Sequence, residues 1–84
     1  MEVDISGAAT TFIILHNDTP GAIAAVTQFL AGQNINIGSF RLSRRQKGGL
    51  AVMTLEVDSP VSTQLNQDLE RLPNIISSTV LAPQ

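Results

Sequence analysis

Apolar and polar residues alternate along this chain with two different periods, which divides it into six segments. Residues 10–15 form a continuous run of apolar and β-favouring side chains, typical of a central strand that is covered on both faces. Residues 20–31 predict an amphipathic helix, because apolar residues recur at steps of three and four. The apolar stripe consists of Ala22, Ile23, Val26, Phe29 and Leu30. We expect Gly32 to end this helix in a left-handed conformation.

Residues 35–45 predict a second strand whose buried face changes partway along. The isoleucines at its start have odd numbers, whereas Phe40 and Leu42 have even numbers. Because strand side chains alternate between the two faces, the simplest explanation is a bulge around Gly38 and Ser39.

The second half of the chain repeats the order of strand and helix. Residues 46–49 contain two glycines and predict a hairpin turn, which leads into a third strand over residues 50–58. Residues 58–60, Asp-Ser-Pro, predict the start of a second helix, and residues 72–74 end it. The apolar stripe of this helix consists of Val61, Leu65, Leu69 and Leu72. Residues 75–81 predict the last strand. The side chains expected to share one of its faces are Ile76, Ser78 and Val80.

This order, β-α-β-β-α-β, predicts an α+β fold, the ferredoxin-like split βαβ sandwich. Right-handed crossovers place both helices on one face of a four-stranded antiparallel sheet. The first and third strands are expected at the centre of the sheet, with the second and fourth at its edges. The opposite face is left to solvent or to a partner.

Composition narrows the possible functions. A chain of 84 residues forms one small domain and buries only about 60–65% of its unfolded surface, which favours association with another subunit. We take residues 1–9 as a leader or the end of a preceding segment, and residues 10–82 as the domain. The absence of cysteine excludes disulfides and thiolate-held metals and favours a cytoplasmic location. The net charge of −2 argues against nucleic-acid binding, and no apolar run is long enough to span a bilayer.

The loop between the first strand and the first helix has the sequence His-Asn-Asp-Thr-Pro-Gly, residues 16–21. Pro20 suits the first helical position, and Thr19 or Asp18 is placed to cap the helix. Such a sequence most often does no more than begin a helix, and that is one interpretation of it here.

The other interpretation is a binding site for a small charged molecule. The amides of Gly21 and Ala22 are expected to point out of the helix end, where they attract a carboxylate or a phosphate. His16, Asn17 and Asp18 surround this position with hydrogen-bond donors and acceptors. The loop is therefore suited to a zwitterion such as an amino acid.

The residues required for other activities found on this fold are absent from this sequence. RNA-recognition domains stack bases on aromatic side chains of the sheet, and the third strand has none. There is no Cys-x-x-Cys for copper, and no Arg or Lys precedes Phe40 to hold an acyl phosphate. His16 and Asp18 make only two potential metal ligands, and no hydroxyl stands out as an activated nucleophile. We therefore expect no metal site and no catalysis by this chain alone.

Four of the five cationic residues lie in the second strand and its turn. They are Arg41, Arg44, Arg45 and Lys47. They indicate either a docking surface for an acidic partner or, as we prefer, a solvated edge strand whose charges discourage unwanted strand pairing. If the second strand pairs across a dimer, Arg41 can reach the partner subunit.

Two motifs, His-Asn-Asp-Thr-Pro-Gly-Ala-Ile at residues 16–23 and Gln-Asn-Ile-Asn-Ile at residues 33–37, resemble the ACT domain, a small regulatory module of amino-acid metabolism. The resemblance covers residues 10–81. Within that family the sequence is most similar to the ACT domain of the iron–sulfur-dependent L-serine dehydratase β chain. That similarity rests on Arg-Leu-Ser-Arg at residues 41–44 and Lys-Gly-Gly at residues 47–49.

The resemblance implies a place for a ligand. ACT domains pair side by side through the second strand, and small amino acids bind between the first loop of one subunit and the second strand of the other. Carried over from the similar serine-binding domain of phosphoglycerate dehydrogenase, the residues that hold the ligand are His16, Asp18 and Asn36. That pattern has Asn at the position of Asp18, and an Asp attracts the ammonium of the ligand but repels its carboxylate. The full set of expected ligand-binding residues is His16, Asn17, Asp18, Pro20, Gly21, Ala22, Asn36 and Ile37.

The resemblance also implies a role. It identifies a non-catalytic regulatory domain of an L-serine dehydratase, a lyase that converts L-serine to pyruvate and ammonia. The domain is expected to bind L-serine or a similar amino acid as a homodimer formed through the second strand and first helix, next to a catalytic dehydratase domain or chain. The 4Fe-4S cluster of such an enzyme needs cysteines and lies outside this chain. The alternatives are a structural dimerisation module without a ligand and a subunit whose loop completes a catalytic site elsewhere.

Overall fold

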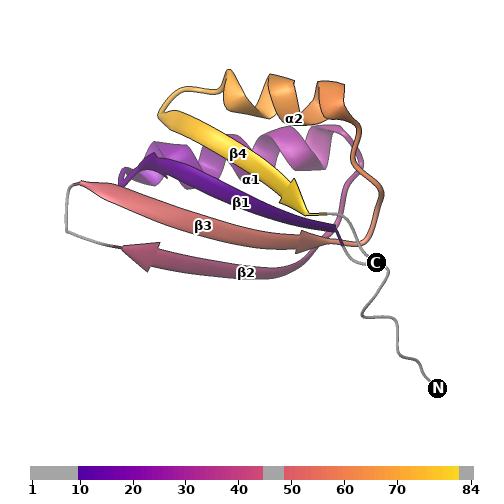
Figure 1. Ribbon diagram of the computed structural model, residues 1–84, viewed down its shortest axis with the longest axis horizontal. Coiled ribbons are helices and arrows are strands. Elements are labelled where there is room, and N and C mark those ends of the chain that lie inside the picture. Colours follow the sequence, from indigo (N-terminus) through magenta and orange to yellow (C-terminus); the bar gives the residue numbers. More distant parts are fainter. Residues whose placement is uncertain (1–9, 45–48, 82–84) are drawn as a thin grey trace.

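The computed structural model describes residues 10–44 and 49–81, and its elements follow the predicted order. They are β1 (Thr10–Asn17), α1 (Pro20–Gly32), β2 (Ile37–Arg44), β3 (Leu50–Val57), α2 (Thr63–Glu70) and β4 (Ile75–Leu81). The strands form one antiparallel sheet in the order β2-β3-β1-β4 (Figure 1), so β1 and β3 are central as predicted. The predicted leader and most of the predicted hairpin turn lie outside the described residues.

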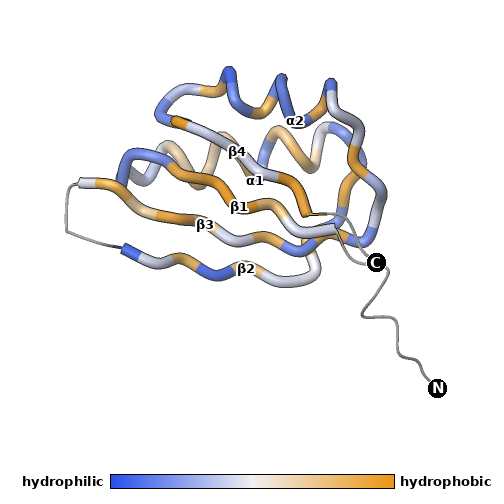
Figure 2. The backbone as a smooth tube through the Cα atoms, viewed as in Figure 1, coloured by the Kyte–Doolittle hydropathy of each residue, from blue (hydrophilic) through white to orange (hydrophobic). Residues whose placement is uncertain are grey.

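Both helices pack against the same face of the sheet, and the hydrophobic core lies between these two layers. The core cluster contains Phe12, Ile14, Val26, Leu30, Ile35, Met53, Leu55, Val57 and Leu69. In Figure 1, α1 lies behind the sheet and α2 runs beside β4. Figure 2 shows the apolar stretches concentrated in β1 and β3, whereas α2 alternates between hydrophilic and hydrophobic residues. The predicted ferredoxin-like α+β fold is confirmed.

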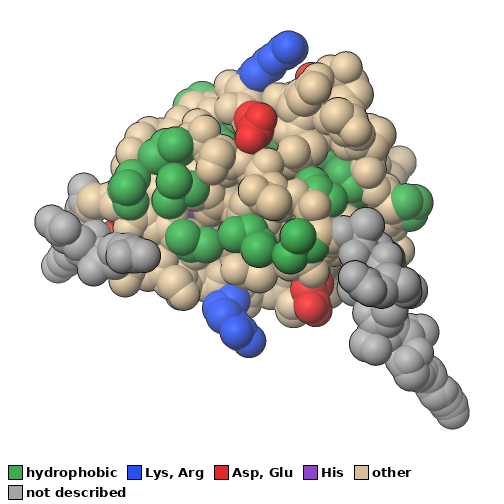
Figure 3. Space-filling model, in the orientation of Figure 1, with side chains coloured by type: hydrophobic (Ala, Val, Ile, Leu, Met, Phe, Trp, Pro, Cys, Tyr) green, Lys and Arg blue, Asp and Glu red, His purple; other side chains and the backbone are tan. Residues whose placement is uncertain are grey.

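The other face of the sheet is not covered by any of the described residues, so the prediction that β1 is covered on both faces was wrong for this part of the chain. Burial alternates along β1: Phe12 and Ile14 are buried, whereas Ile13 is 37% exposed. Burial alternates in the same way along β3. The two helices cover only one face of the sheet, so a continuous apolar run does not by itself imply that both faces are covered. Figure 3 looks onto the strand side and shows a band of hydrophobic side chains across it.

The bulge predicted in β2 is confirmed. Its pairing with β3 shifts between Ile37 and Ser39, which leaves Gly38 without a partner in the register. After this shift, Phe40 and Leu42 lie opposite core residues of β3. The strand begins at Ile37, two residues later than predicted.

A second irregularity, in β4, was not predicted. Leu15 lies opposite Ser77, but His16 lies opposite Ile75, so one residue of β4 is left over. Ile75 consequently packs against the core, whereas Ile76 is 49% exposed. The prediction that Ile76 shares a face with Ser78 and Val80 was therefore wrong.

Asn34, not Gly32, takes the left-handed conformation at the end of α1. Its φ is 60°, its N–H donates to the carbonyl of Ala31 at 3.0 Å, and the N–H of Ile35 donates to the carbonyl of Leu30 at 3.0 Å. These two bonds form a Schellman motif, in which a contact between the buried Leu30 and Ile35 closes the helix end.

The helix α2 begins three residues after the predicted position. Ser62 is its N-cap, and its hydroxyl accepts a hydrogen bond of 3.0 Å from the N–H of Leu65. The competing cap at Ser62 decides the start of the helix, so the prediction from residues 58–60 was wrong. Val61 and Leu72 flank the helix and still pack against the core.

Candidate functional site

Backbone hydrogen bonds hold the loop between β1 and α1 against the starts of two other strands. The N–H of Asn17 donates to the carbonyl of Asn74, just before β4, at 2.9 Å. The N–H of Asp18 donates to the carbonyl of Gly49, just before β3, at 2.8 Å. The N–H of Thr19 donates back to the carbonyl of Asn17 at 2.8 Å. The loop therefore has a fixed path at one end of the sheet.

His16 is fully buried, on the same face of β1 as the core residues. Its Nδ1 lies 2.8 Å from the carbonyl oxygen of Asn17, so in the neutral ring Nδ1 carries the proton and donates it. Nε2 is then a hydrogen-bond acceptor, and it is buried without a partner among the described residues. The hydroxyl oxygen of Thr19 is also buried and without a partner there. Buried polar atoms are normally paired, so each of these two atoms points to a missing partner.

The start of α1 has an N-cap residue, but no side chain forms a capping hydrogen bond with its amides. Pro20 is at the first helical position as predicted, and Thr19 occupies the N-cap without a side-chain hydrogen bond. The carboxylate of Asp18 binds Arg44 instead of the helix amides. Thr19 is therefore the N-cap residue, but the prediction that the Thr19 or Asp18 side chain caps the free amides was wrong.

One of the two amides expected at the helix end is in use. The N–H of Ala22 donates to the carbonyl of Thr19 at 3.2 Å, and the Ala22 side chain is fully buried. The Gly21 N–H has no backbone acceptor in the described parts of the chain. Gly21 is exposed, and a Cβ placed on it meets nothing within 4 Å. The first amide of the helix without a backbone acceptor among the described residues therefore belongs to an exposed residue.

Arg44 is a residue of this region that the sequence analysis placed in the cationic cluster of the second strand but not in the predicted site. Its Nε lies 3.1 Å from Oδ1 and 3.1 Å from Oδ2 of Asp18. The side chain of Asp18 is 10% exposed, whereas that of Arg44 is 58% exposed. A signal was present: Arg44 shares even numbering with Phe40 and Leu42, which places it on the helix side of β2.

The two remaining predicted residues lie at the opposite end of the sheet. Asn36 is exposed just before β2, and Ile37 is the half-buried first residue of that strand. Pairing through β3 aligns Ile37 with Thr10 and aligns Arg44 with His16. The length of β2, about 23 Å at 3.3 Å per residue, therefore separates Asn36 from the loop. A single chain does not bring the two halves of the predicted site together.

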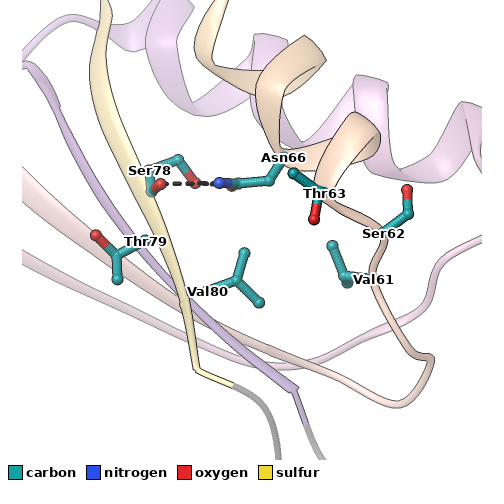
Figure 4. A pocket seen from close by; sticks show the side chains of 7 residues that line it. All are labelled: Val61, Ser62, Thr63, Asn66, Ser78, Thr79 and Val80. Atoms are coloured by element: carbon teal, nitrogen blue, oxygen red, sulfur yellow. Dashed lines mark hydrogen bonds between the residues drawn. The ribbon is translucent and has the colours of Figure 1, made fainter.

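A separate hollow of about 460 Å³ lies between the start of α2 and the end of β4 (Figure 4). It is lined by Val61, Ser62, Thr63, Asn66, Ser78, Thr79 and Val80. None of the predicted site residues lines it. Its lining holds no charged side chain, and Asn66 and Ser78 are already hydrogen-bonded to each other. The hollow therefore offers nothing to balance the charges of a zwitterion.

Among residues 10–44 and 49–81, no three His, Cys, Asp or Glu side chains gather in a way that could hold a metal ion. No helix in the same part of the chain is long and apolar enough to cross a membrane.

Comparison with known proteins places this geometry in a family. Residues 12–77 match the model of the AHAS small subunit-like ACT domain. The chain is 40% identical over 81 residues to the probable L-serine dehydratase, beta chain, of Bacillus subtilis, which covers 96% of this chain and 37% of that protein. It is 36% identical over 64 residues to D-3-phosphoglycerate dehydrogenase of Bacillus subtilis, which covers 76% of this chain and 12% of that protein. The chain thus spans a minor part of either relative.

Solved structures share the fold at low sequence identity. The ACT domain from GTP pyrophosphokinase of Chlorobium tepidum superposes with a TM-score of 0.69 at 18% identity, over 87% of this chain and 96% of that one. A formyltetrahydrofolate deformylase from Pseudomonas putida has a TM-score of 0.74 at 14% identity, over 89% of this chain and 29% of that one. The family model and the similarity to the L-serine dehydratase beta chain agree with the predicted resemblance, and the chain belongs to the ACT domain family.

Proposed function

We propose that this chain is the non-catalytic regulatory domain of an L-serine dehydratase of the cytoplasm. In this proposal it binds L-serine, or another small amino acid, at the seam of a side-by-side homodimer. The observation that carries the proposal is a pair of buried polar atoms, His16 Nε2 and Thr19 Oγ1, which have no hydrogen-bond partner among the described residues and lie next to the exposed start of α1. The similarity to the L-serine dehydratase beta chain supports the choice of ligand and parent enzyme.

The two edges of the sheet differ, and the difference favours pairing through β2. At the β4 edge, Asn66 and Glu70 of α2 bind the backbone of Ser78: Asn66 Nδ2 donates to its carbonyl at 3.0 Å, and Glu70 Oε2 accepts from its N–H at 2.7 Å. Within the described residues β2 pairs only with β3, and Figure 1 shows no helix along its outer side. A strand edge with free N–H and C=O groups is a template for a second chain.

Pairing of two β2 strands accounts for the separated halves of the site. An antiparallel pairing about a twofold axis at the middle of β2 aligns the start of one β2 with the end of the other. The partner subunit's Asn36 then lies near Arg44 and the loop of the first chain. Each dimer would contain two such sites, and each site would be built from both chains.

The loop matches the chemistry of an amino-acid zwitterion. The free amide of Gly21 at the helix N-terminus suits the carboxylate of the ligand. The acceptor Nε2 of His16 suits an N–H or O–H donor, which the ammonium and hydroxyl groups of serine both provide. Serine is so small that its binding free energy is limited to about 10 kcal/mol, and modest affinity is appropriate for a sensor of metabolite concentration. The ligand can shift the enzyme only through its different affinities for two states.

The catalytic chemistry belongs elsewhere in the parent enzyme. The chain has no cysteine to hold the 4Fe-4S cluster expected of an iron–sulfur L-serine dehydratase. We therefore propose a catalytic dehydratase domain or chain as the second partner, which carries the cluster.

Isothermal titration calorimetry with L-serine tests the proposal, combined with analytical ultracentrifugation of the same sample. We expect saturable binding of one L-serine per chain to a dimer, and much weaker binding of D-serine as the stereochemical control. Asn36→Ala is expected to abolish binding while the dimer persists. A confirmed dimer that produces no binding heat with L-serine would contradict the proposal and would leave the structural dimerisation module and the subunit that completes a catalytic site elsewhere.

A further inference from the structure

We infer that Arg44 is the charge-compensating residue of the ligand site: it neutralises Asp18, so that the loop accepts the carboxylate of an amino acid. This inference rests on the proposed function. It assigns a role to a residue that is not among the expected ligand-binding residues. It also explains how the loop can bind a carboxylate although it has the charged Asp18 where the related pattern has a neutral Asn.

The Arg44 side chain contacts the carboxylate group of Asp18. The Nε of Arg44 is within 3.1 Å of both carboxylate oxygens of Asp18, although the two residues are 26 positions apart in the sequence. The Asp18 side chain is 90% shielded from solvent, so water screens its charge poorly, and the guanidinium is its ion-pair partner within the described residues. The pair as a unit has no net charge.

The position of Asp18 makes this compensation necessary. Asp18 lies two residues before the first helical residue and one before Thr19, whose buried hydroxyl has no partner in the part of the chain that the structure describes. A ligand carboxylate at the Gly21 amide therefore approaches an acid, and like charges at short range oppose binding. With Arg44 in place, the ligand meets a neutral pair whose Asp18 oxygens still accept hydrogen bonds, from an ammonium for example. An Asn at the same position would offer one such oxygen and no charge.

Arg44 also connects the site with the dimer seam. It is the last residue of β2, the strand whose outer side is open, and its side chain is 58% exposed. In the proposed dimer the start of the partner's β2 lies beside it. The same residue therefore borders both the ligand and the second chain.

A double-mutant experiment tests the inference with L-serine as the probe. Arg44→Gln leaves Asp18 uncompensated and is expected to weaken L-serine binding by about tenfold or more. Adding Asp18→Asn to that variant removes the charge and is expected to restore the affinity to within about threefold of wild type. Arg71→Gln is the matched control, since Arg71 forms an exposed ion pair with Asp68 on α2, at 3.8 Å.

The outcomes separate this inference from the proposed function. If wild type does not bind L-serine, the proposed function fails, and the inference fails with it. If wild type binds and Arg44→Gln binds equally well, only the inference is overturned. If Arg44→Gln binds weakly and the double variant does not recover, Arg44 contacts the ligand directly and compensation of Asp18 is overturned. Thermal melts of all variants show whether each one is folded, so a loss of affinity is not confused with a loss of structure.

Discussion

The backbone N–H of Ile35 donates a hydrogen bond to the carbonyl oxygen of Leu30. This bond closes a turn of six residues, in which Asn34 has the left-handed conformation. Both partners are buried in the core cluster. The end of α1 is thus fixed by backbone hydrogen bonds and by apolar packing together. This turn also sets the direction in which the chain enters β2, where half of the proposed ligand site lies.

Replacement of Asn34 tests this turn. An L-residue without a short polar side chain is strained at a φ of 60°, so we expect Asn34→Ala to lower the free energy of unfolding by about 1 kcal/mol. Asn34→Gly is the matched control and is expected to match or slightly exceed wild type. Urea denaturation measures both. Equal loss in the two variants would mean that the Asn34 side chain, not its backbone conformation, matters.

Asn66 is expected to stabilise the contact between α2 and β4. Its side chain donates to the Ser78 carbonyl at 3.0 Å and accepts from the Ser78 hydroxyl at 2.6 Å. Asn66→Ala leaves polar groups of the buried Ser78 unpaired and should lower the unfolding free energy by about 1–3 kcal/mol. Gln67→Ala, an exposed neighbour on the same helix, should change it by about 0.5 kcal/mol or less. Similar effects at both positions in urea unfolding would contradict this role.

Adjacent isoleucines of β1 distinguish the two faces of the sheet. Ile14 is fully buried and Ile13 is 37% exposed. We expect Ile14→Ala to lower the unfolding free energy by about 2–5 kcal/mol and Ile13→Ala by about 1 kcal/mol or less. The comparison also reports on the open face, because a large loss at Ile13 would show that another chain covers this face in solution.

Mixed dimers test whether each ligand site is built from two chains. In the proposed site, Asp18 accepts hydrogen bonds from the ligand and Asn36 comes from the partner, so neither the Asp18→Ala nor the Asn36→Ala homodimer is expected to bind L-serine. A heterodimer of the two variants contains one site with both residues intact. We therefore expect refolded mixtures to regain L-serine binding in about half of the dimers, with one site each, as measured by calorimetry. Mixtures that remain silent although heterodimers have formed would place the site within a single chain.

The sequence predicted the architecture because its signals were local. Hydrophobic periodicity located all six elements, and the change of parity between Ile37 and Phe40 located the bulge in β2. Errors occurred where two local signals competed. Ser62, not a residue near Pro60, caps the start of α2, and Asn34, not Gly32, has the left-handed conformation after α1. In both cases the position of the cap depends on which residue closes the turn against the core.

The candidate site was predicted only in part, since its contacts are long-range. The even numbering of Arg44 indicates its face of β2 but does not identify Asp18 as its partner, because the contact exists only after β2 has paired with β3 and β3 with β1. The burial of His16 likewise depends on the helices covering one face of the sheet. Conversely, the loop and Asn36 were grouped by resemblance, although the fold of one chain keeps them at opposite ends.

In the proposed dimer, the hydrogen bonds from Asn66 and Glu70 to Ser78 are expected to limit how many copies assemble. A sheet with two unpaired edge strands can pair with further copies at both edges and grow into a fibre. Here α2 occupies the backbone N–H and C=O of Ser78 on the β4 edge, so in the proposed dimer lateral growth is expected to end once two molecules have joined. Loss of the Asn66 and Glu70 side chains is therefore expected to do more than loosen a helix, because it would free this edge for pairing with further copies.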